Sequence, residues 1–575
     1  MSVDINFMVG GEAGQGVQSV GFLLGKVLAR GGWHVFSDQD YESRVRGGHN
    51  FLRVRAKDSP VGAIATPVDM LLALNRESID LHRKEVTSDG VIIFDGDKVK
   101  GVTGSKLFSV PLAKLSEEKA GSKLMENTVA LAAVLGLVGY DFKLLEKLLL
   151  EHFGAGDVGK DNVKAARAGY DYARSNFKGK FSRKLSPIGK GGRMYLNGNE
   201  AIALGAIAAG CKFMAAYPMT PASSIMEYLA AKADDLDLVM VHAEDEIAAM
   251  NMTIGAAFAG VRAMTATSGS GFCLMVEGLG LAGITETPIV AVDAQRPGPA
   301  TGLPTRTEQG DLEFVLHAHP GDFPRAVLAP ATIEDAFWLT VKAFNLAEKY
   351  QTPVIILTDQ HLASSYTTTD KFDLSQVTID RGLLYEPGKK DEGEYKRHKV
   401  TRSGISPRAF PGQKGVLVAS DADEHNESGH LIEDAATRNA QVEKRLRKLS
   451  GLSKEISAPK LEGPRKAETT LIGWGSSGGA LREAAEMLRR DGLGTNLLHL
   501  NELWPFPAEA VARALDGATN SYVVESNATG QLSQLIRRET DRQATGSMLK
   551  YDGRPLTPAD IAATVRRRYD HGNNS

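Results

Sequence analysis

The stretch INFMVGGEAGQGVQSVGFLLGKVLARGG, residues 5–32, decides the fold of the first part of the chain. Its apolar run Ile5–Val9 predicts a buried strand, and the glycines that follow predict a turn. After the turn, apolar residues recur at helical spacing as far as Gly31 and Gly32, which mark the end of the helix. A strand, a glycine turn and a helix in this order are typical of an α/β domain.

A second series of strand and helix signals starts at residue 194. The run NGNEAIALGAIAAG, residues 197–210, predicts a helix that is capped by Asn197 or Asn199. The run FMAAYPMTP, residues 213–221, predicts a short strand that ends in a proline turn. Further strand signals are Val239–His242, Met264–Thr267, Pro288–Ala294 and Pro353–Thr358. Because strands and helices alternate, we expect an α/β protein with several doubly wound domains built on parallel sheets.

Two segments of different composition divide the chain. The basic, turn-rich segment Lys178–Arg193 predicts a solvated linker, and a polar, charged region from about residue 380 to 466 predicts an arm or insertion that meets another surface. A third strand, glycine turn and helix follow in residues 468–490. The predicted division is 1–182, a linker at 183–193, 194–380, the arm at 381–466, and 467–575.

The composition excludes several classes of protein. A net charge of −3 over 575 residues is unsuited to a general polyanion binder, so we expect no nucleic-acid partner. Two cysteines, Cys211 and Cys273, are too few for a four-cysteine iron–sulfur cluster or a disulfide scaffold. No apolar run reaches the roughly 18 residues of a membrane helix, and the start has no signal-peptide pattern. We therefore expect a cytoplasmic protein with no membrane partner.

The glycine-rich segment Gly10–Gly16 supports two interpretations. Its backbone N–H groups could cradle a phosphate at the start of the following helix, or its glycines could serve a tight turn that needs positive φ. The spacing matches neither a dinucleotide fingerprint nor a Walker loop, so both interpretations stay open.

Several polar residues follow predicted strands of the second series, at the sheet edge where α/β proteins bind ligands. Thr220 lies in the proline turn, where it is either a ligand-binding hydroxyl or a helix cap. Glu246 begins a helix that is poor in polar residues, so its carboxylate is expected near a cleft or interface. Arg296 and Thr305 lie in a loop rich in glycine and proline, and with Thr220 they are candidates to bind a carboxylate. His317 and His319 are expected to be structural, and we predict no metal site in this chain.

Taken together, these motifs resemble a known family. The segments YPMTPAS (217–223), EDEIAAMNMTIGAAFAG (244–260), TSGSG (267–271) and AQRPGPATGLPTRTEQGDL (294–312) resemble the alpha subunit of 2-oxoacid:ferredoxin oxidoreductases. GGEAGQG (10–16) and YESRVRGGHN (41–50) resemble the gamma domain of these enzymes, here fused ahead of alpha. ESNATGQLSQLIR (525–537) resembles their transketolase C-terminal-like domain. The fusion is most similar to enzymes of the 2-oxoglutarate type.

The resemblance implies half of an enzyme. It assigns residues 194–380 to a pyrimidine-type thiamine diphosphate-binding domain and residues 467–575 to the transketolase C-terminal-like domain. It implies a beta subunit that carries the Mg²⁺-diphosphate site and a [4Fe-4S] cluster, with ferredoxin as electron acceptor and an alpha2beta2 assembly. The implied reaction converts 2-oxoglutarate, coenzyme A and oxidised ferredoxin reversibly to succinyl-CoA, CO₂ and reduced ferredoxin.

Roles of single residues also follow from the resemblance. Glu246 matches the glutamate that bonds N1′ of the aminopyrimidine ring, beside Tyr217 and Pro218. Thr220, Arg296 and Thr305 match positions that hold the substrate carboxylate and ketone oxygen, although Met219 and Ala222 depart from the commoner motif. The candidates for binding coenzyme A are Gly14, Gln15, Gly16, Arg44 and Arg46.

Two alternatives remain. The chain could belong to a pyruvate or branched-chain 2-oxo acid version of the enzyme, or it could be a non-catalytic binding subunit. The presence of Thr220, Glu246 and Arg296 argues against the second alternative, because a scaffold does not need them.

Overall fold

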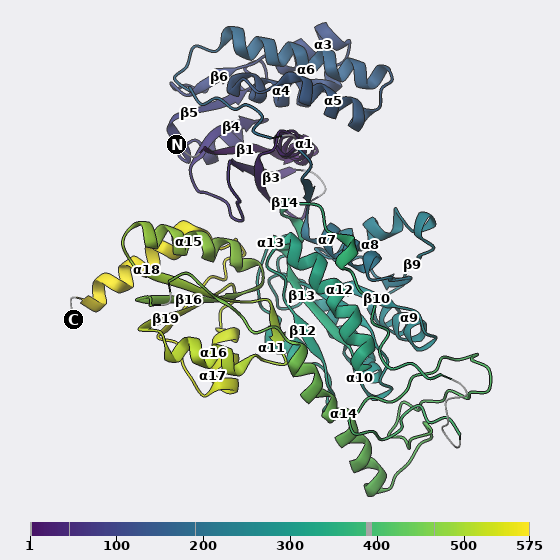
Figure 1. Cartoon of the computed structure of the whole chain (residues 1–575). Helices are drawn as coiled ribbons and strands as arrows, with labels where there is room; N and C mark the ends of the chain where they lie inside the picture. Colours follow the sequence, from purple (N-terminus) through teal and green to yellow (C-terminus); the bar gives the residue numbers. More distant parts are fainter. Residues whose placement is uncertain (1–2, 45–46, 190, 387–393, 465, 574–575) are drawn as a thin grey trace. The chain divides into compact units, whose positions relative to one another are not determined.

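The computed structural model of the chain describes residues 3–44, 47–189, 191–386, 394–464 and 466–573. The chain forms two compact units. The first unit contains residues 1–196, 364–371 and 557–559, and the second contains residues 197–363, 372–556 and 560–575. Figure 1 labels many of their helices and strands.

The first unit is built on an eight-stranded sheet in the order β6-β5-β4-β1-β3-β2-β14-β7. Its strands are β1 (Asp4–Ala13), β2 (His34–Asp40), β3 (Gly47–Lys57), β4 (Val68–Ala73), β5 (Val86–Phe94), β6 (Leu107–Ser109), β7 (Met194–Leu196) and β14 (Tyr366–Thr369). The sheet is mixed, because β1 pairs with β4 in parallel and with β3 antiparallel. Strands β7 and β14, at the start and near the end of residues 194–380, both lie in this first sheet. The predicted domain boundaries stay predictions.

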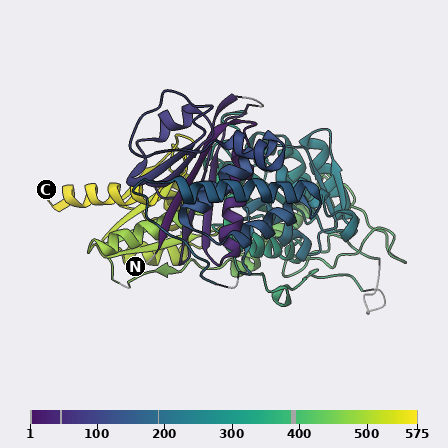
Figure 2. The ribbon, with the colours of Figure 1, turned by 90° about the horizontal axis from the view of Figure 1, so that it is seen from above.

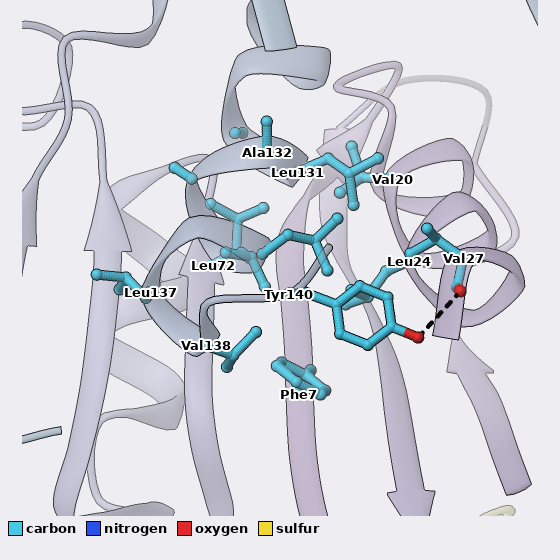
Figure 3. Packing of buried hydrophobic residues seen from close by; sticks show 14 of the residues in the cluster. Phe7, Val20, Leu24, Val27, Leu72, Leu131, Ala132, Leu137, Val138 and Tyr140 are labelled. Atoms are coloured by element: carbon cyan, nitrogen blue, oxygen red, sulfur yellow. Dashed lines mark hydrogen bonds between the residues drawn. The ribbon is translucent and has the colours of Figure 1, made fainter. Parts of the chain in front are cut away.

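The helices of the first unit bury an extended apolar core. They are α1 (Val17–Arg30), α2 (Arg76–His82), α3 (Leu112–Ala120), η1 (Lys123–Met125), α4 (Glu126–Val138), α5 (Phe142–Phe153) and α6 (Asp157–Asn176). Every residue of α4 from Thr128 to Val138 is buried, and Figure 3 shows its side chains among those of α1, Phe7 and Leu72. The Tyr140 hydroxyl donates to the backbone oxygen of Val27 at 3.4 Å.

One helix expected from the sequence is divided in the structure. The sequence predicts a helical stretch over about residues 117–137, whereas α3 ends at Ala120 and α4 begins at Glu126. Gly121 adopts a left-handed conformation at φ 70° and ends α3, and Ser122 caps the short helix that follows. The apolar pattern alone gave no sign of this break.

The second unit contains two sheets, and both are mainly parallel. The larger sheet has the order β18-β12-β13-β11-β10-β8-β9. Its strands are β8 (Phe213–Ala216), β9 (Val239–His242), β10 (Ala263–Thr267), β11 (Val290–Gln295), β12 (Ala326–Leu328), β13 (Val354–Asp359) and β18 (Glu502–Trp504). Its helices are α7 (Gly198–Ala208), α8 (Ser223–Ala230), η2 (Asp234–Leu236), α9 (Glu246–Phe258), α10 (Gly269–Ile284), α11 (Leu312–His317), α12 (Ile333–Tyr350) and α13 (Gln360–Ser364). These parallel strands with their helices confirm the α/β class expected from the sequence.

The smaller sheet has the order β15-β17-β16-β19-β20. Its strands are β15 (Leu461–Glu462), β16 (Thr469–Trp474), β17 (Thr495–Leu500), β19 (Asn520–Glu525) and β20 (Gly546–Leu549). Helices α15 (Gly478–Arg490) and α18 (Pro558–Asn573) lie on one side of it, and α16 (Ala508–Asp516) and α17 (Gln531–Thr540) lie on the other (Figure 1). In Figure 2, α18 leads out to the C-terminus.

The described residues of the arm (381–386, 394–464 and 466) have little regular structure apart from one long helix. The long helix of the arm is α14 (Ala435–Glu455). Two short helices lie outside the arm, η3 (Leu374–Gln376) before it and η4 (Gly475–Ser477) after it. Figure 1 shows the irregular loops of the arm beside α14. The buried side chains of α14 include Lys444 and Lys448, so this helix packs by charge as well as by apolar contact.

Candidate active site

Four neighbouring parallel strands end at the same edge of the larger sheet. Strands β9, β8, β10 and β11 lie side by side, and the candidate residues follow their carboxyl ends. Tyr217 to Pro221 follow β8, Glu246 follows β9, the segment 268–271 follows β10 and Arg296 follows β11. The topology therefore gathers candidates from four separate segments at the edge where ligands bind in this fold class.

Glu246 is held at the first position of α9. Asp245 caps this helix by accepting a hydrogen bond from the backbone N–H of Ala248 at 2.7 Å, which leaves Glu246 free for another role. The Glu246 side chain is only 3% exposed, and within the described ranges its Oε1 has no hydrogen-bond partner. A buried carboxylate oxygen without a partner is costly, so its presence indicates a ligand site.

Gly271 supplies the space in front of this carboxylate. A Cβ atom at Gly271 would lie 2.4 Å from Oε1 of Glu246 and 2.1 Å from Oγ1 of Thr267. No side chain fits at position 271, so the backbone of the first turn of α10 lies directly against the Glu246 carboxylate. The position requires glycine for close approach and not for backbone conformation.

Arg296 joins two of the strand ends. Its Nη1 donates to the backbone oxygen of Thr220 at 2.7 Å, and its Nη2 donates to Oγ of Ser270 at 3.3 Å. Burial lowers the pKa of its guanidinium, and the charge of Asp311 acts in the opposite direction. Its Nε is buried and bonds to no other described residue. The guanidinium is thus fixed in place with donor capacity left over.

The turn that carries Thr220 is braced from α7. The Thr220–Pro221 peptide bond is cis, and Nδ2 of Asn199 donates to the Pro221 oxygen at 2.7 Å and to Oγ of Ser224 at 2.8 Å. Asn197 is the helix cap, in a capping box with Glu200. Of the two asparagines that the sequence offered as caps, one therefore caps the helix and the other holds the proline turn.

The structure brings some predicted residues together and leaves others apart. Thr220 and Arg296 share a hydrogen bond, and Glu246 meets the same 268–271 segment that Arg296 contacts. Thr305 is buried in the loop that leads from Arg296 to α11, and its role stays a prediction. Tyr217 and Pro218 are exposed, and the Tyr217 ring lies 6.4 Å from that of His242.

Sequence reasoning missed two acidic residues at this edge. Asp293 lies within β11 and is fully buried, and Asp311 directly precedes α11. Asp293 interrupts the apolar run PIVAVDA, and this interruption is the signal that could have found it. Asp311 gave no such signal, because an acid before a helix is ordinary.

The glycine-rich segment of the first unit forms a tight turn. Strand β1 continues through Gly10 and Gly11 to Ala13, so the turn consists of Gly14, Gln15 and Gly16 alone. Both glycines have positive φ, at 92° and 81°, and Nδ2 of Asn127 donates to the Gln15 oxygen at 3.0 Å. A coenzyme A role for this turn stays a prediction.

Two arginines, Arg44 and Arg46, were predicted with this turn to bind coenzyme A, and the structure describes one of them. Arg44 is exposed and forms an ion pair with Glu42 at 3.0 Å. Arg46 lies outside the described residues.

Two general features of the described residues bear on function. No group of three or more His, Cys, Asp or Glu side chains among them could hold a metal ion. None of the helices that the structure describes is long and apolar enough to cross a membrane.

Three family models match successive parts of the chain. Residues 6–172 match the model described as pyruvate ferredoxin/flavodoxin oxidoreductase. Residues 204–444 match the thiamine diphosphate-binding part of pyruvate flavodoxin/ferredoxin oxidoreductase. Residues 467–561 match core domain II of pyruvate:ferredoxin oxidoreductase.

Curated relatives align over nearly the whole chain. The 2-oxoacid:ferredoxin oxidoreductase subunit alpha of a Sulfolobus species is 34% identical, over 96% of this chain and 95% of its own length. The 2-oxoglutarate oxidoreductase subunit KorA of Mycobacterium tuberculosis is 28% identical, over 92% of this chain and 86% of its own length.

A solved structure has the same fold throughout. The 2-oxoglutarate:ferredoxin oxidoreductase of Magnetococcus marinus, with 2-oxoglutarate, coenzyme A and succinyl-CoA bound, is 32% identical and superposes with a TM-score of 0.91. The match covers 98% of this chain and 99% of that one. By sequence and by fold, this chain belongs to the family of 2-oxoacid:ferredoxin oxidoreductase alpha subunits, which are subunits of oxidoreductases.

Proposed function

We propose that this chain forms the pyrimidine half of a thiamine diphosphate site in a 2-oxoglutarate:ferredoxin oxidoreductase. One observation carries the proposal: Oε1 of the buried Glu246 has no partner among the described residues and lies against the side-chain-free Gly271. Thiamine diphosphate, when bound, supplies a nucleophilic carbon and an electron sink for the decarboxylation of a 2-oxo acid.

The residues at this edge fit that cofactor. The Glu246 carboxyl group would hold a proton between its Oε1 and ring nitrogen N1′ of the aminopyrimidine. Buried surroundings strengthen such a hydrogen bond, because water does not compete for either partner. Tyr217 and Pro218, which are exposed, would border the ring from the outside.

Arg296 would bind the carboxylate of the 2-oxo acid. Its guanidinium is already oriented by Thr220 and Ser270, and a planar fork of donors matches a carboxylate. The hydroxyl groups of Thr220 and Thr305 would donate to the carboxylate or to the ketone oxygen. Orientation before binding reduces the entropy that binding must overcome.

The chain needs a partner for the remaining chemistry. With two cysteines it cannot hold a [4Fe-4S] cluster alone, which supports a beta subunit that carries the cluster and the Mg²⁺-diphosphate site. The same proposal includes ferredoxin as the electron acceptor and an alpha2beta2 assembly in the cytoplasm. It also includes the division of the chain into the five segments predicted from the sequence. Coenzyme A would bind near Gly14, Gln15, Gly16, Arg44 and Arg46.

The description of the Magnetococcus marinus relative supports the substrate. That protein was solved with 2-oxoglutarate, coenzyme A and succinyl-CoA, and it aligns with almost the entire chain. A second candidate is pyruvate, which the descriptions of the three family models name. An assay with both acids separates the two.

The test uses the complex of this chain with its partner subunit, purified without oxygen. Coenzyme A-dependent viologen reduction is measured with 2-oxoglutarate, pyruvate and a branched-chain 2-oxo acid, and bound thiamine diphosphate is quantified. We expect 2-oxoglutarate to be preferred. Glu246→Gln should lower turnover at least about 100-fold in an assembled complex, because proton transfer at N1′ is lost.

The matched control is Glu244→Gln, an exposed acid two residues earlier, which should behave as the unchanged complex does. A complex that reduces viologen with none of the acids would support the non-catalytic alternative. Full turnover in Glu246→Gln would remove the cofactor role of this residue.

A further inference from the structure

Two acids near the proposed substrate arginine, one fully buried and one partly buried, lack bonds that buried carboxylate oxygens normally have. Asp293 is fully buried in β11, and neither of its carboxylate oxygens bonds to any residue that the structure describes. Asp311 uses its backbone N–H to donate to Oε1 of Gln295 at 3.0 Å, while its Oδ2 likewise has no bond within the described ranges. Such groups are rare in folded proteins and call for a physical explanation.

The carboxylate of Asp311 faces the start of α10. A Cβ atom at Gly269 would lie 2.5 Å from its Oδ2, so the acid rests against the backbone of the first helical residue. The next residue, Ser270, bonds to Arg296. Asp311, Gly269, Ser270 and Arg296 therefore form one contiguous cluster. Asp293 lies on β11, the strand that Arg296 follows.

The charges that act on this pair are few. Arg296 favours the ionised form of Asp311, whereas Glu308 disfavours it. Burial, and next the charge of Glu308, raise the pKa of Asp311 to about 7 against the lowering effect of Arg296. Burial and the charge of Asp311 raise the pKa of Asp293 well above its ordinary value. Burial and the charges of Asp311 and Asp293 also raise the pKa of the Cys273 thiol, which lies on α10.

Ionising both carboxylates in these surroundings would be costly, because removing each charge from water costs several kcal/mol. One arginine cannot offset this cost for both acids. A carboxyl group that keeps its proton avoids this cost, so we infer that the pair holds at least one proton under neutral conditions.

We propose that Asp293 and Asp311 are positioning residues that hold a proton behind Arg296, and that Asp311 takes up a proton from solvent when Arg296 binds the carboxylate of the 2-oxo acid. The inference rests on the proposed function, because it takes Arg296 as the carboxylate site. A bound carboxylate offsets the charge of Arg296, and the ionised form of Asp311 then loses its stabilising neighbour. One proton moves from water to the Asp311 carboxylate, and no other bond changes.

Proton uptake on binding has a defined signature. Affinity for the acid should fall as the pH rises above about 7, by up to about tenfold per pH unit, until Asp311 is ionised in both states. KM should therefore rise with pH, while kcat changes little from this cause. A residue with a purely structural role would not give this split.

The test measures KM and kcat of the complex between pH 6 and 9. We expect the rise of KM to be present in the unchanged complex and flattened in Asp311→Asn. The matched control is Asp322→Asn, an exposed acid in the same unit, which should keep the rise. An equal rise of KM in Asp311→Asn would overturn the proposal.

A second measurement needs neither a variant nor turnover. Titration calorimetry of the unchanged complex with glutarate, in phosphate and in Tris at pH 7.5, reports the protons taken up from the buffer. We expect an uptake of roughly half a proton, and binding without uptake would overturn the proposal. Because this readout does not depend on catalysis, it distinguishes failure of the inference from failure of the proposed function, which the viologen assay tests.

Discussion

Two regions of the second unit bury acidic groups, and they treat them in opposite ways. In the arm anchor, formed by Glu286, His398, Lys444 and Lys448, a fully buried carboxylate is surrounded by nitrogen donors. Lys448 Nζ lies 2.5 Å and His398 Nδ1 lies 2.9 Å from its oxygens, and Lys444 forms a further ion pair with it. At the candidate active site, Asp293 and one oxygen of Glu246 have no such partners among the described residues.

The pKa values of the acids show the same difference. Burial opposes ionisation of Glu286, but Lys444, Lys448 and His398 lower the pKa of its carboxyl well below its ordinary value. Burial raises the pKa of Asp293 well above its ordinary value, because only another acid lies near enough to act on it. A buried acid with partners holds the structure together, whereas we propose that one without partners marks the place where a ligand or a proton is held.

The largest effect is expected from breaking the arm anchor. Glu286→Gln leaves two buried lysines without their counter-charge, so the free energy of unfolding should fall by about 3–5 kcal/mol. Chemical denaturation of the complex measures this change. The control Glu433→Gln removes an exposed acid of the arm and should have almost no effect. Equal stability of Glu286→Gln and Glu433→Gln would show that the lysines do not need this carboxylate.

Filling the space between Gly271 and Glu246 with a methyl group should lower turnover more than it lowers stability. Gly271→Ala places a methyl group against Glu246 and Thr267, so turnover should fall by about 100-fold as the carboxylate is displaced. The viologen assay measures this, with retained assembly confirmed by gel filtration. The control Gly255→Ala lies on the exposed face of α9, where a Cβ would meet no described atom within 4 Å. That control should keep full turnover and gain about 0.5–1 kcal/mol of stability.

The smallest expected effect is a change in stability at the candidate active site. Its sign is opposite to that expected from breaking the arm anchor. The folded-state pKa of Asp311 is raised, so its burial costs stability above the unfolded pKa, and the cost grows until pH reaches about 7. Asp311→Asn should therefore stabilise the complex at pH 8 by about 1–3 kcal/mol, and by less at pH 5. Thermal unfolding at both pH values measures the difference. Destabilisation at pH 8 would mean that Asp311 has a stabilising partner after all.

The sequence predicted much of the larger sheet and part of the site. Strand signals at 213–221 and 239–242 correspond to β8 and β9, because short apolar runs that end in proline or acidic turns have few alternative structures. Thr220, Glu246 and Arg296 were identified as candidates from their places after strands, and the structure gathers them around one helix start. Their roles stay predictions.

Other features depend on distant residues and could not be predicted. Strands β7 and β14 join the first sheet across about 170 residues of intervening chain, which no local pattern reveals. The arm was predicted from its polarity, but the burial of Lys444 and Lys448 was not predicted, because lysine is normally exposed. Their burial depends on Glu286, which lies in another segment.

By itself the sequence determined the order of strands and helices, the glycine turns and the types of residue available at each strand end. These follow from local periodicity and backbone preference, which need no knowledge of distant contacts. Only the tertiary structure decided which acids are compensated and which are not. Compensation depends on burial and on partners from distant segments, so Glu286 and Asp293 look alike in the sequence and differ completely in the fold.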